Sequence, residues 1–182
     1  MRLLAWMVIG SIPTAAIGLG FKEHFEAMFD SPWVVGTAFL VTGLLLLATR
    51  WIPGGVTDER SLVWWQALLI GVVQGLAITP GISRSGSTIA AGLLLGLDRE
   101  FAARFSFLLS IPAIAGASLL ELKDLSLEAG QALPLFVGFM AALCTGYLAL
   151  LLLLRLVNKG SFWKFSPYLC LVAALSFGVG MS

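Results

Sequence analysis

Residues Leu62–Leu97 read LVWWQALLIGVVQGLAITPGISRSGSTIAAGLLLGL, a mostly apolar stretch that proline, glycine, serine and arginine interrupt at Thr79–Ser87. Two full membrane spans joined by a tight turn fit its length, and so does a re-entrant pair of helices that meet at membrane depth. Either arrangement enters and leaves the membrane on one side. Irregular backbone at that depth is tolerated only where protein or a water-filled cavity surrounds it, so a re-entrant pair requires enclosing neighbours.

The composition of the whole chain is that of a membrane protein. Of its 182 residues, 59% are hydrophobic and 12% are charged, and the mean hydropathy is +0.97. Ordinary soluble domains carry about 25% charged residues, so this chain cannot form a polar shell. We therefore expect a single integral membrane domain over residues 1–182. A net charge of +1 gives no electrostatic case for binding nucleic acid.

The apolar runs predict an all-α polytopic fold. We expect about five transmembrane helices plus one re-entrant helix-loop-helix pair at about residues 62–97. The first run is taken as a helix and not as a signal peptide, because it is long and further spans follow. Small residues four apart, Gly71/Gly75 and Gly92/Gly96, favour close packing between helices. The five expected spans are Leu3–Gly20, Trp33–Thr49, Ala102–Leu120, Leu133–Leu154 and Ser166–Met181.

The basic residues predict the orientation of the chain. If residues 62–97 enter and leave on one side, eight basic residues share that side, and Lys22 and Lys123 lie on the other. The positive-inside rule then places the eight in the cytoplasm and points the interruption around Arg84 toward the outer face. The eight are Arg2, Arg50, Arg60, Arg99, Arg104, Arg155, Lys159 and Lys164.

The interruption predicts an anion site. Arginine within a membrane segment is costly, so Arg84 is a candidate functional residue, and its planar guanidinium suits bidentate contact with phosphate. Gly81 and Gly86 allow backbone amides to approach a ligand closely. A helix that starts near the interruption points its positive end at the same place. Hydroxyl donors surround the arginine at Ser83, Ser85, Ser87 and Thr88. The alternative is a simple turn whose serines cap the next helix while Arg84 extends to the lipid headgroups.

The stretch GVVQGLAITPGISRSGSTIAAGLLLGLDREFAARFSFLLSIPAIAGA, Gly71–Ala117, resembles a signature region of the undecaprenyl-diphosphate phosphatases, also called bacitracin-resistance proteins. The Pro-Gly-x-Ser-Arg-Ser-Gly-x-Thr core at Pro80–Thr88 carries the resemblance, and FSFLLSIPA at Phe105–Ala113 follows at the family's usual distance. The opening GSIPTAAIGL, Gly10–Leu19, is also similar. The resemblance covers essentially the whole chain.

The resemblance implies an enzyme that hydrolyses undecaprenyl diphosphate at the outer face of the bacterial inner membrane. It thereby recycles the carrier lipid for peptidoglycan synthesis and confers resistance to bacitracin. The family fold has two inverted repeats, each with a re-entrant pair, and this chain matches the second. Ser83, Arg84 and Ser85 match catalytic positions. Positions that bind the diphosphate match Gly81, Gly86, Ser87, Thr88 and Gln74.

The family's first repeat has no counterpart here. That repeat carries two glutamates four apart and a histidine, which are expected to bind a divalent cation, Mg²⁺ or Ca²⁺, and to carry out the attack. In this chain Glu23, His24 and Glu26 lie in a charged connection and are expected to be solvated. We therefore expect no metal ligands in these 182 residues and little phosphatase activity from them alone.

Two other functions fit parts of the sequence. A non-catalytic polyprenyl-phosphate binding or transport protein needs Arg84 and the hydroxyls but no base, and broken helices in inverted repeats are common in transporters. A structural membrane subunit leaves Arg84 unexplained. The expected partners are a polyprenyl diphosphate lipid, the membrane and a second copy of the chain in a homodimer.

Overall fold

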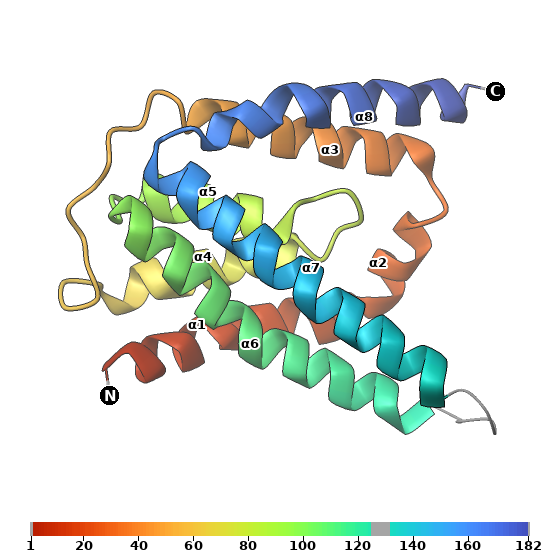
Figure 1. Cartoon of the computed structure of the whole chain (residues 1–182), viewed down its shortest axis with the longest axis horizontal. Helices are drawn as coiled ribbons and strands as arrows, with labels where there is room; N and C mark the ends of the chain where they lie inside the picture. Colours follow the sequence, from red (N-terminus) through yellow and green to blue (C-terminus); the bar gives the residue numbers. More distant parts are fainter. Residues whose placement is uncertain (1, 125–131, 182) are drawn as a thin grey trace.

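The computed structural model describes residues 2–124 and 132–181, in which the regular elements are helices (Figure 1). This confirms the all-α polytopic prediction. In chain order the elements are α1 (Arg2–Gly20), α2 (Lys22–Met28), α3 (Pro32–Ala48), α4 (Trp64–Leu76), α5 (Arg84–Leu94), α6 (Arg99–Asp124), α7 (Ala132–Asn158), the 3-10 helix η1 (Phe162–Phe165) and α8 (Ser166–Gly180).

The long helices agree with the expected spans. Within the described residues, α1, α6, α7 and η1 with α8 are each long and apolar enough to cross a membrane. The pair α2 and α3, bent by 99° at the break between the two helices, gives a fifth candidate span if the two helices are counted as one. The connection expected at Glu121–Glu128 lies partly outside the described residues.

Helix α2 was not expected, because Lys22–Asp30 was taken as a charged connection. It forms one short amphipathic segment in which Phe25 is buried, while Lys22 and Glu26 form an exposed ion pair of 3.6 Å. Glu23 and His24 are exposed, as expected. The structure therefore adds a helix to the connection without changing the solvation of its charged side chains.

Helices α4 and α5 form a re-entrant pair. They contain 13 and 11 residues, which at 1.5 Å per residue gives lengths of about 20 Å and 16 Å, against about 30 Å for the hydrocarbon core. Their open ends are tied together, since Thr57 N donates to Gly96 O at 3.1 Å and Asp98 N donates to Thr57 O at 2.9 Å. Two full spans are thereby excluded.

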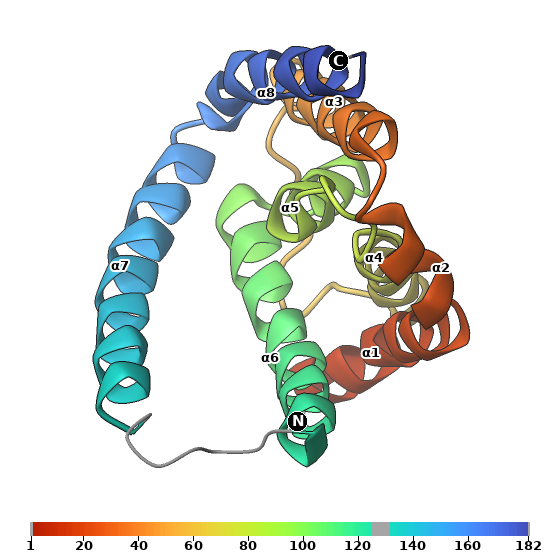
Figure 2. The ribbon, with the colours of Figure 1, turned by 90° about the vertical axis from the view of Figure 1, so that its right-hand side faces the viewer.

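The pair is enclosed by helices that pack closely. Helix α1 runs beside α4, α6 crosses α5, and α3 pairs with α8 (Figures 1 and 2). The contact of α1 with α4 is backbone to backbone, because a Cβ atom at Gly71 would lie 2.0 Å from the carbonyl oxygen of Gly10. The expected role of Gly71 in close packing is confirmed. In Figure 2, α7 stands apart from α6, and its side chains at 133–149 are exposed.

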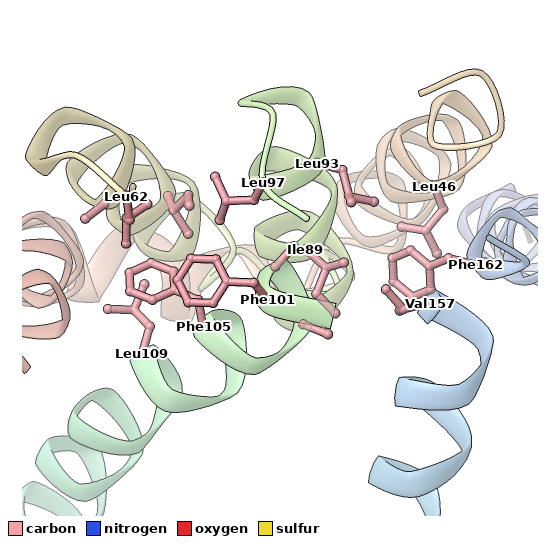
Figure 3. Packing of buried hydrophobic residues seen from close by; sticks show 14 of the residues in the cluster. Leu46, Leu62, Ile89, Leu93, Leu97, Phe101, Phe105, Leu109, Val157 and Phe162 are labelled. Carbon is pink, nitrogen blue, oxygen red and sulfur yellow. The ribbon is translucent and has the colours of Figure 1, made fainter. Parts of the chain in front are cut away.

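The buried apolar cluster lies beside the open end of the re-entrant pair. Figure 3 shows Phe101, Phe105 and Leu109 along one face of α6, with Leu97 beside them. Val157, at the end of α7, joins the same cluster. This packing fixes α6 against α5. Residues on other faces of α6 are thereby held at a fixed distance from α5, and they can form a site with it.

Several of the eight basic residues lie near one another, close to the end of the molecule that carries the N-terminus. Contacts between segments hold this end together. Arg2 Nη1 donates to Arg60 O at 3.2 Å, and Arg99 Nη2 donates to Ile52 O at 2.6 Å. Arg50 lies 4.8 Å from the ring centroid of Trp163. The loop between α4 and α5 points toward the opposite end (Figure 1).

Candidate functional site

The loop at residues 77–83 packs against α3, while Ile78 remains exposed. Gly81 has a φ of +91°, and a Cβ atom there would lie 2.6 Å from the carbonyl oxygen of Val35 on α3. Ser83 N donates to the buried hydroxyl of Thr42, also on α3, at 3.2 Å. Contacts with α3 therefore hold part of the irregular backbone, as a loop at membrane depth requires. Gly81 serves this packing and does not line the cavity described below.

Ser83 is the N-cap of α5. Its hydroxyl accepts from Gly86 N at 3.1 Å, and its carbonyl accepts from Ser87 N at 2.8 Å. Gly86 must be small, because a Cβ atom there would lie 2.8 Å from Ser83 Oγ. Among the described residues the N–H groups of Arg84 and Ser85 have no acceptor. Two free donors therefore remain at the positive end of the helix.

A cavity of about 210 Å³ lies between the first turn of α5 and the middle of α6. It is lined by Arg84, Ser85, Ser106, Phe107 and Ser110. Among the described residues the guanidinium of Arg84 has no carboxylate or carbonyl partner, and the hydroxyl of Ser85 has no hydrogen-bond partner. A guanidinium, free amides and hydroxyls that face one volume favour an anion with several oxygens, such as phosphate.

Thr88 is buried behind the cavity wall. Its hydroxyl donates to Arg84 O at 2.8 Å and contacts Ser106 Oγ at 2.5 Å. Only 1% of the residue is exposed. Because its hydroxyl contacts both Arg84 O and Ser106 Oγ, it stabilises the first turn of α5 against α6. Ser87 is also buried, and within the described part of the chain its hydroxyl has no partner. Direct contact of either residue with a diphosphate stays a prediction.

Gln74 joins three helices. It is buried on α4, and its Nε2 atom donates to Thr14 Oγ1 on α1 at 3.2 Å and to Leu109 O on α6 at 3.3 Å. Its Oε1 atom has no partner among the described residues. Gln74 does not line the cavity, so the structure gives it a role in packing, and its contact with substrate stays a prediction.

Sequence reasoning missed Ser106 and Ser110 as site residues. Both lie in the FSFLLSIPA stretch, where apolar neighbours concealed them. The available signal was their spacing, since residues four apart share one face of a helix. A pair of serines on one face of a membrane helix, two and six residues before Pro112, marks a polar stripe.

The cavity does not fit a divalent cation. Such ions take oxygen ligands, chiefly carboxylates and carbonyls, whereas the lining offers a cation and hydrogen-bond donors. In residues 2–124 and 132–181 there is no group of three or more His, Cys, Asp and Glu residues that could hold a metal. Glu23, His24 and Glu26 lie on α2, outside the cavity lining.

Comparison with known proteins identifies relatives. A family described as "Bacitracin resistance protein BacA" matches residues 1–175. A protein of Desulfatibacillum aliphaticivorans is 49% identical over 174 residues, which are 95% of this chain and 63% of that protein. A protein of Desulfosudis oleivorans is 48% identical over the full 182 residues, which cover 66% of it. Both are named undecaprenyl-diphosphatase.

The relatives differ in length. This chain spans about two thirds of the two proteins above. A relative from Methanothermobacter thermautotrophicus, also named undecaprenyl-diphosphatase, is 45% identical over 168 residues. That match covers 89% of this chain and 92% of the relative, so the two are similar in length.

Proposed function

This chain belongs to the bacitracin resistance protein BacA family, and from that membership we propose that it serves the hydrolysis of undecaprenyl diphosphate to undecaprenyl phosphate and phosphate. One observation carries the proposal: the unpaired guanidinium of Arg84 faces a cavity beside the free amides of α5. The relatives' name supports the choice of substrate.

The cavity would bind and stabilise the negative charge. The Arg84 guanidinium would hold two phosphate oxygens, and the amides of Arg84 and Ser85 would donate to the same phosphoryl group. The hydroxyl of Ser83 accepts from Gly86 and keeps its own proton for an anion. Donors already in place lower the cost of the charge that develops when the phosphoanhydride bond breaks.

The attack on phosphorus needs a further group. A serine can attack only beside a base, and the cavity lining contains neither a carboxylate nor a histidine. We therefore assign this cavity the binding and charge-stabilising half of the reaction, with Arg84 and Ser85 in its lining and Ser83 as the N-cap beside it. A divalent cation, Mg²⁺ or Ca²⁺, enters the proposal through the family resemblance alone, and no step is assigned to it.

The setting of the reaction is part of the proposal. The contacts that join several basic residues at one end, such as Arg2 with the Arg60 carbonyl, support a cytoplasmic position for that end, which places the α4–α5 loop toward the outer face. Such a site would act on carrier lipid at the outer face of a bacterial inner membrane, in peptidoglycan synthesis, and would contribute to bacitracin resistance. A homodimer is also part of the proposal and stays a prediction.

A second function remains for test. A non-catalytic polyprenyl-phosphate binder or transporter would use the same donors, and the lack of a base among the cavity residues favours it. The two functions differ in turnover, because a binder retains the phosphoanhydride bond.

The test measures phosphate release from undecaprenyl diphosphate with Mg²⁺ and then with Ca²⁺. The proteins are the 182-residue chain, a fusion of it with the part of the Desulfatibacillum relative that it does not cover, and the Arg84→Ala variant of that fusion. We expect turnover by the fusion, little by the chain alone, and a loss of about a hundredfold or more in the variant. An inactive fusion that still binds the lipid supports the binder. Near-normal turnover by the Arg84→Ala fusion would leave Arg84 as a headgroup anchor.

A further inference from the structure

The cavity has a second wall, which α6 supplies through Ser106, Phe107 and Ser110. We propose that Ser110 donates a hydrogen bond to the bound phosphate and that Ser106 is a positioning residue that holds α6 against α5. This inference rests on the proposed function, since it concerns the same cavity. It assigns hydroxyls from a second helix to the recognition of a phosphoryl group.

The hydrogen-bond inventory separates the two serines. The hydroxyl of Thr88 has one proton, and the nearby carbonyl of Arg84, at 2.8 Å, can only accept it. With Thr88 donating to that carbonyl, the proton in the contact between Thr88 and Ser106 comes from Ser106, although either hydroxyl can be the donor there. In either arrangement the Ser106 hydroxyl is bonded to Thr88, so it links α6 to the first turn of α5, which carries Arg84.

Ser110 is free to turn. Its hydroxyl donates to Phe107 O at 2.7 Å, and the residue is half-buried on the cavity wall. In an α-helix the carbonyl of residue 107 also receives the backbone N–H of residue 111. Rotation of the Ser110 hydroxyl into the cavity therefore leaves no carbonyl unpaired, and it requires only a change between staggered rotamers.

Two walls suit a phosphoryl group better than a planar anion. Arg84 and Ser85 approach the cavity from α5, and Ser110 approaches it from α6. A phosphoryl group has three oxygens that point in different directions, so donors on opposite sides can all be used. A carboxylate bound by the Arg84 guanidinium would use both of its oxygens on the α5 side of the cavity. It would then leave the Ser110 hydroxyl on α6 without a partner.

The experiment measures the dissociation constants of inorganic diphosphate and of acetate for the full chain in lipid nanodiscs, together with thermal unfolding midpoints. The variants are Ser110→Ala, Ser110→Thr, Ser106→Ala and Arg84→Ala. Ser176→Ala is the matched control, because the hydroxyl of Ser176 donates to a carbonyl of its own helix, α8, in the same way. A Thr88→Val variant and the Ser106→Ala/Thr88→Val double variant complete a cycle.

We expect Ser110→Ala to weaken diphosphate binding about tenfold without lowering the unfolding midpoint, and Ser110→Thr to restore it. Acetate binding should not change. Ser106→Ala should weaken diphosphate binding, and its effect should not add to that of Thr88→Val. Equal affinities in Ser110→Ala and Ser176→Ala would overturn the role of Ser110, and a Ser106→Ala variant with lower stability but unchanged affinity would overturn positioning by Ser106. If Arg84→Ala also binds normally, the proposed function itself fails.

Discussion

Hydrogen bonds and close packing of the neighbouring residues fix the position of Arg84. Ser83 caps α5, Gly86 leaves room for that cap, and Thr88 binds the carbonyl of Arg84. These contacts fix the backbone and leave the guanidinium without a protein partner among the described residues. For this residue, the question is whether anion binding needs the bidentate geometry of a guanidinium or only a positive charge.

Replacing Arg84 by lysine tests that distinction. Arg84→Lys keeps the positive charge but loses the bidentate geometry, so we expect inorganic diphosphate to bind at least about tenfold more weakly. Arg50→Lys is the control, since Arg50 lies at the other end of the molecule against Trp163. Equal affinity in wild type and Arg84→Lys, measured by titration calorimetry, would show that charge alone is sufficient.

The carboxylate of Asp58, which lies outside the membrane-spanning helices, is expected to make the stability of its turn depend on pH. The hydroxyl and the amide of Ser61 donate to its carboxylate at 2.7 Å and 2.9 Å, and these bonds lower the pKa of Asp58 from its usual value of 3.8. A depressed pKa means that the turn gains stability above the unfolded-state pKa and loses it as pH falls through the folded-state pKa.

We therefore expect Asp58→Asn to lower the thermal midpoint slightly at neutral pH and to flatten its decline in acid. Thermal unfolding of both proteins, followed from about pH 7 to about pH 3, measures the effect. Asp30→Asn is a control, because Asp30 is another exposed aspartate outside the long helices. A midpoint with the same acid dependence in Asp58→Asn as in wild type would contradict the assignment.

At the scale of elements, the re-entrant pair depends on the crossing of α1 and α4. Gly71→Ala would place a methyl group 2.0 Å from the Gly10 carbonyl oxygen, so the two helices must separate. Overpacking of this kind costs about 1–3 kcal/mol, which predicts a thermal midpoint roughly 2–10 °C lower. Gly116→Ala is the control, since a Cβ atom there meets nothing within 4 Å. Equal midpoints for the two variants would mean that α1 and α4 do not touch there.

The elements also show which features a single sequence reveals. The spans followed from apolar runs, and the break in the re-entrant pair followed from Pro80, Gly81 and the hydroxyls around Arg84. Helix α2 was missed because its polar residues are typical of a connection and its pattern is too short to indicate a period. The spacing of the α6 serines indicates a shared helix face, but their role depends on where α6 crosses α5, which no local pattern encodes.

At the scale of the whole molecule, the distribution of charge predicts topology. In a background with Cys144→Ala and Cys170→Ala, which removes the free thiols, single Ser85→Cys and Asn158→Cys substitutions can be labelled in intact cells. We expect an impermeant maleimide to react at position 85 and to reach position 158 only after permeabilisation. Labelling of position 158 but not of position 85 would invert the topology.

The central claim is that a diphosphate occupies the cavity between α5 and α6. A structure of the chain in lipid nanodiscs with methylenediphosphonate, a non-hydrolysable diphosphate, tests it most directly. We predict a phosphorus peak in the cavity, with oxygens within hydrogen-bond distance of the Arg84 guanidinium and of the hydroxyls of Ser85 and Ser110. A cavity that contains only water, with Arg84 extended to the headgroups or the anion held by basic residues at the opposite end, would contradict it.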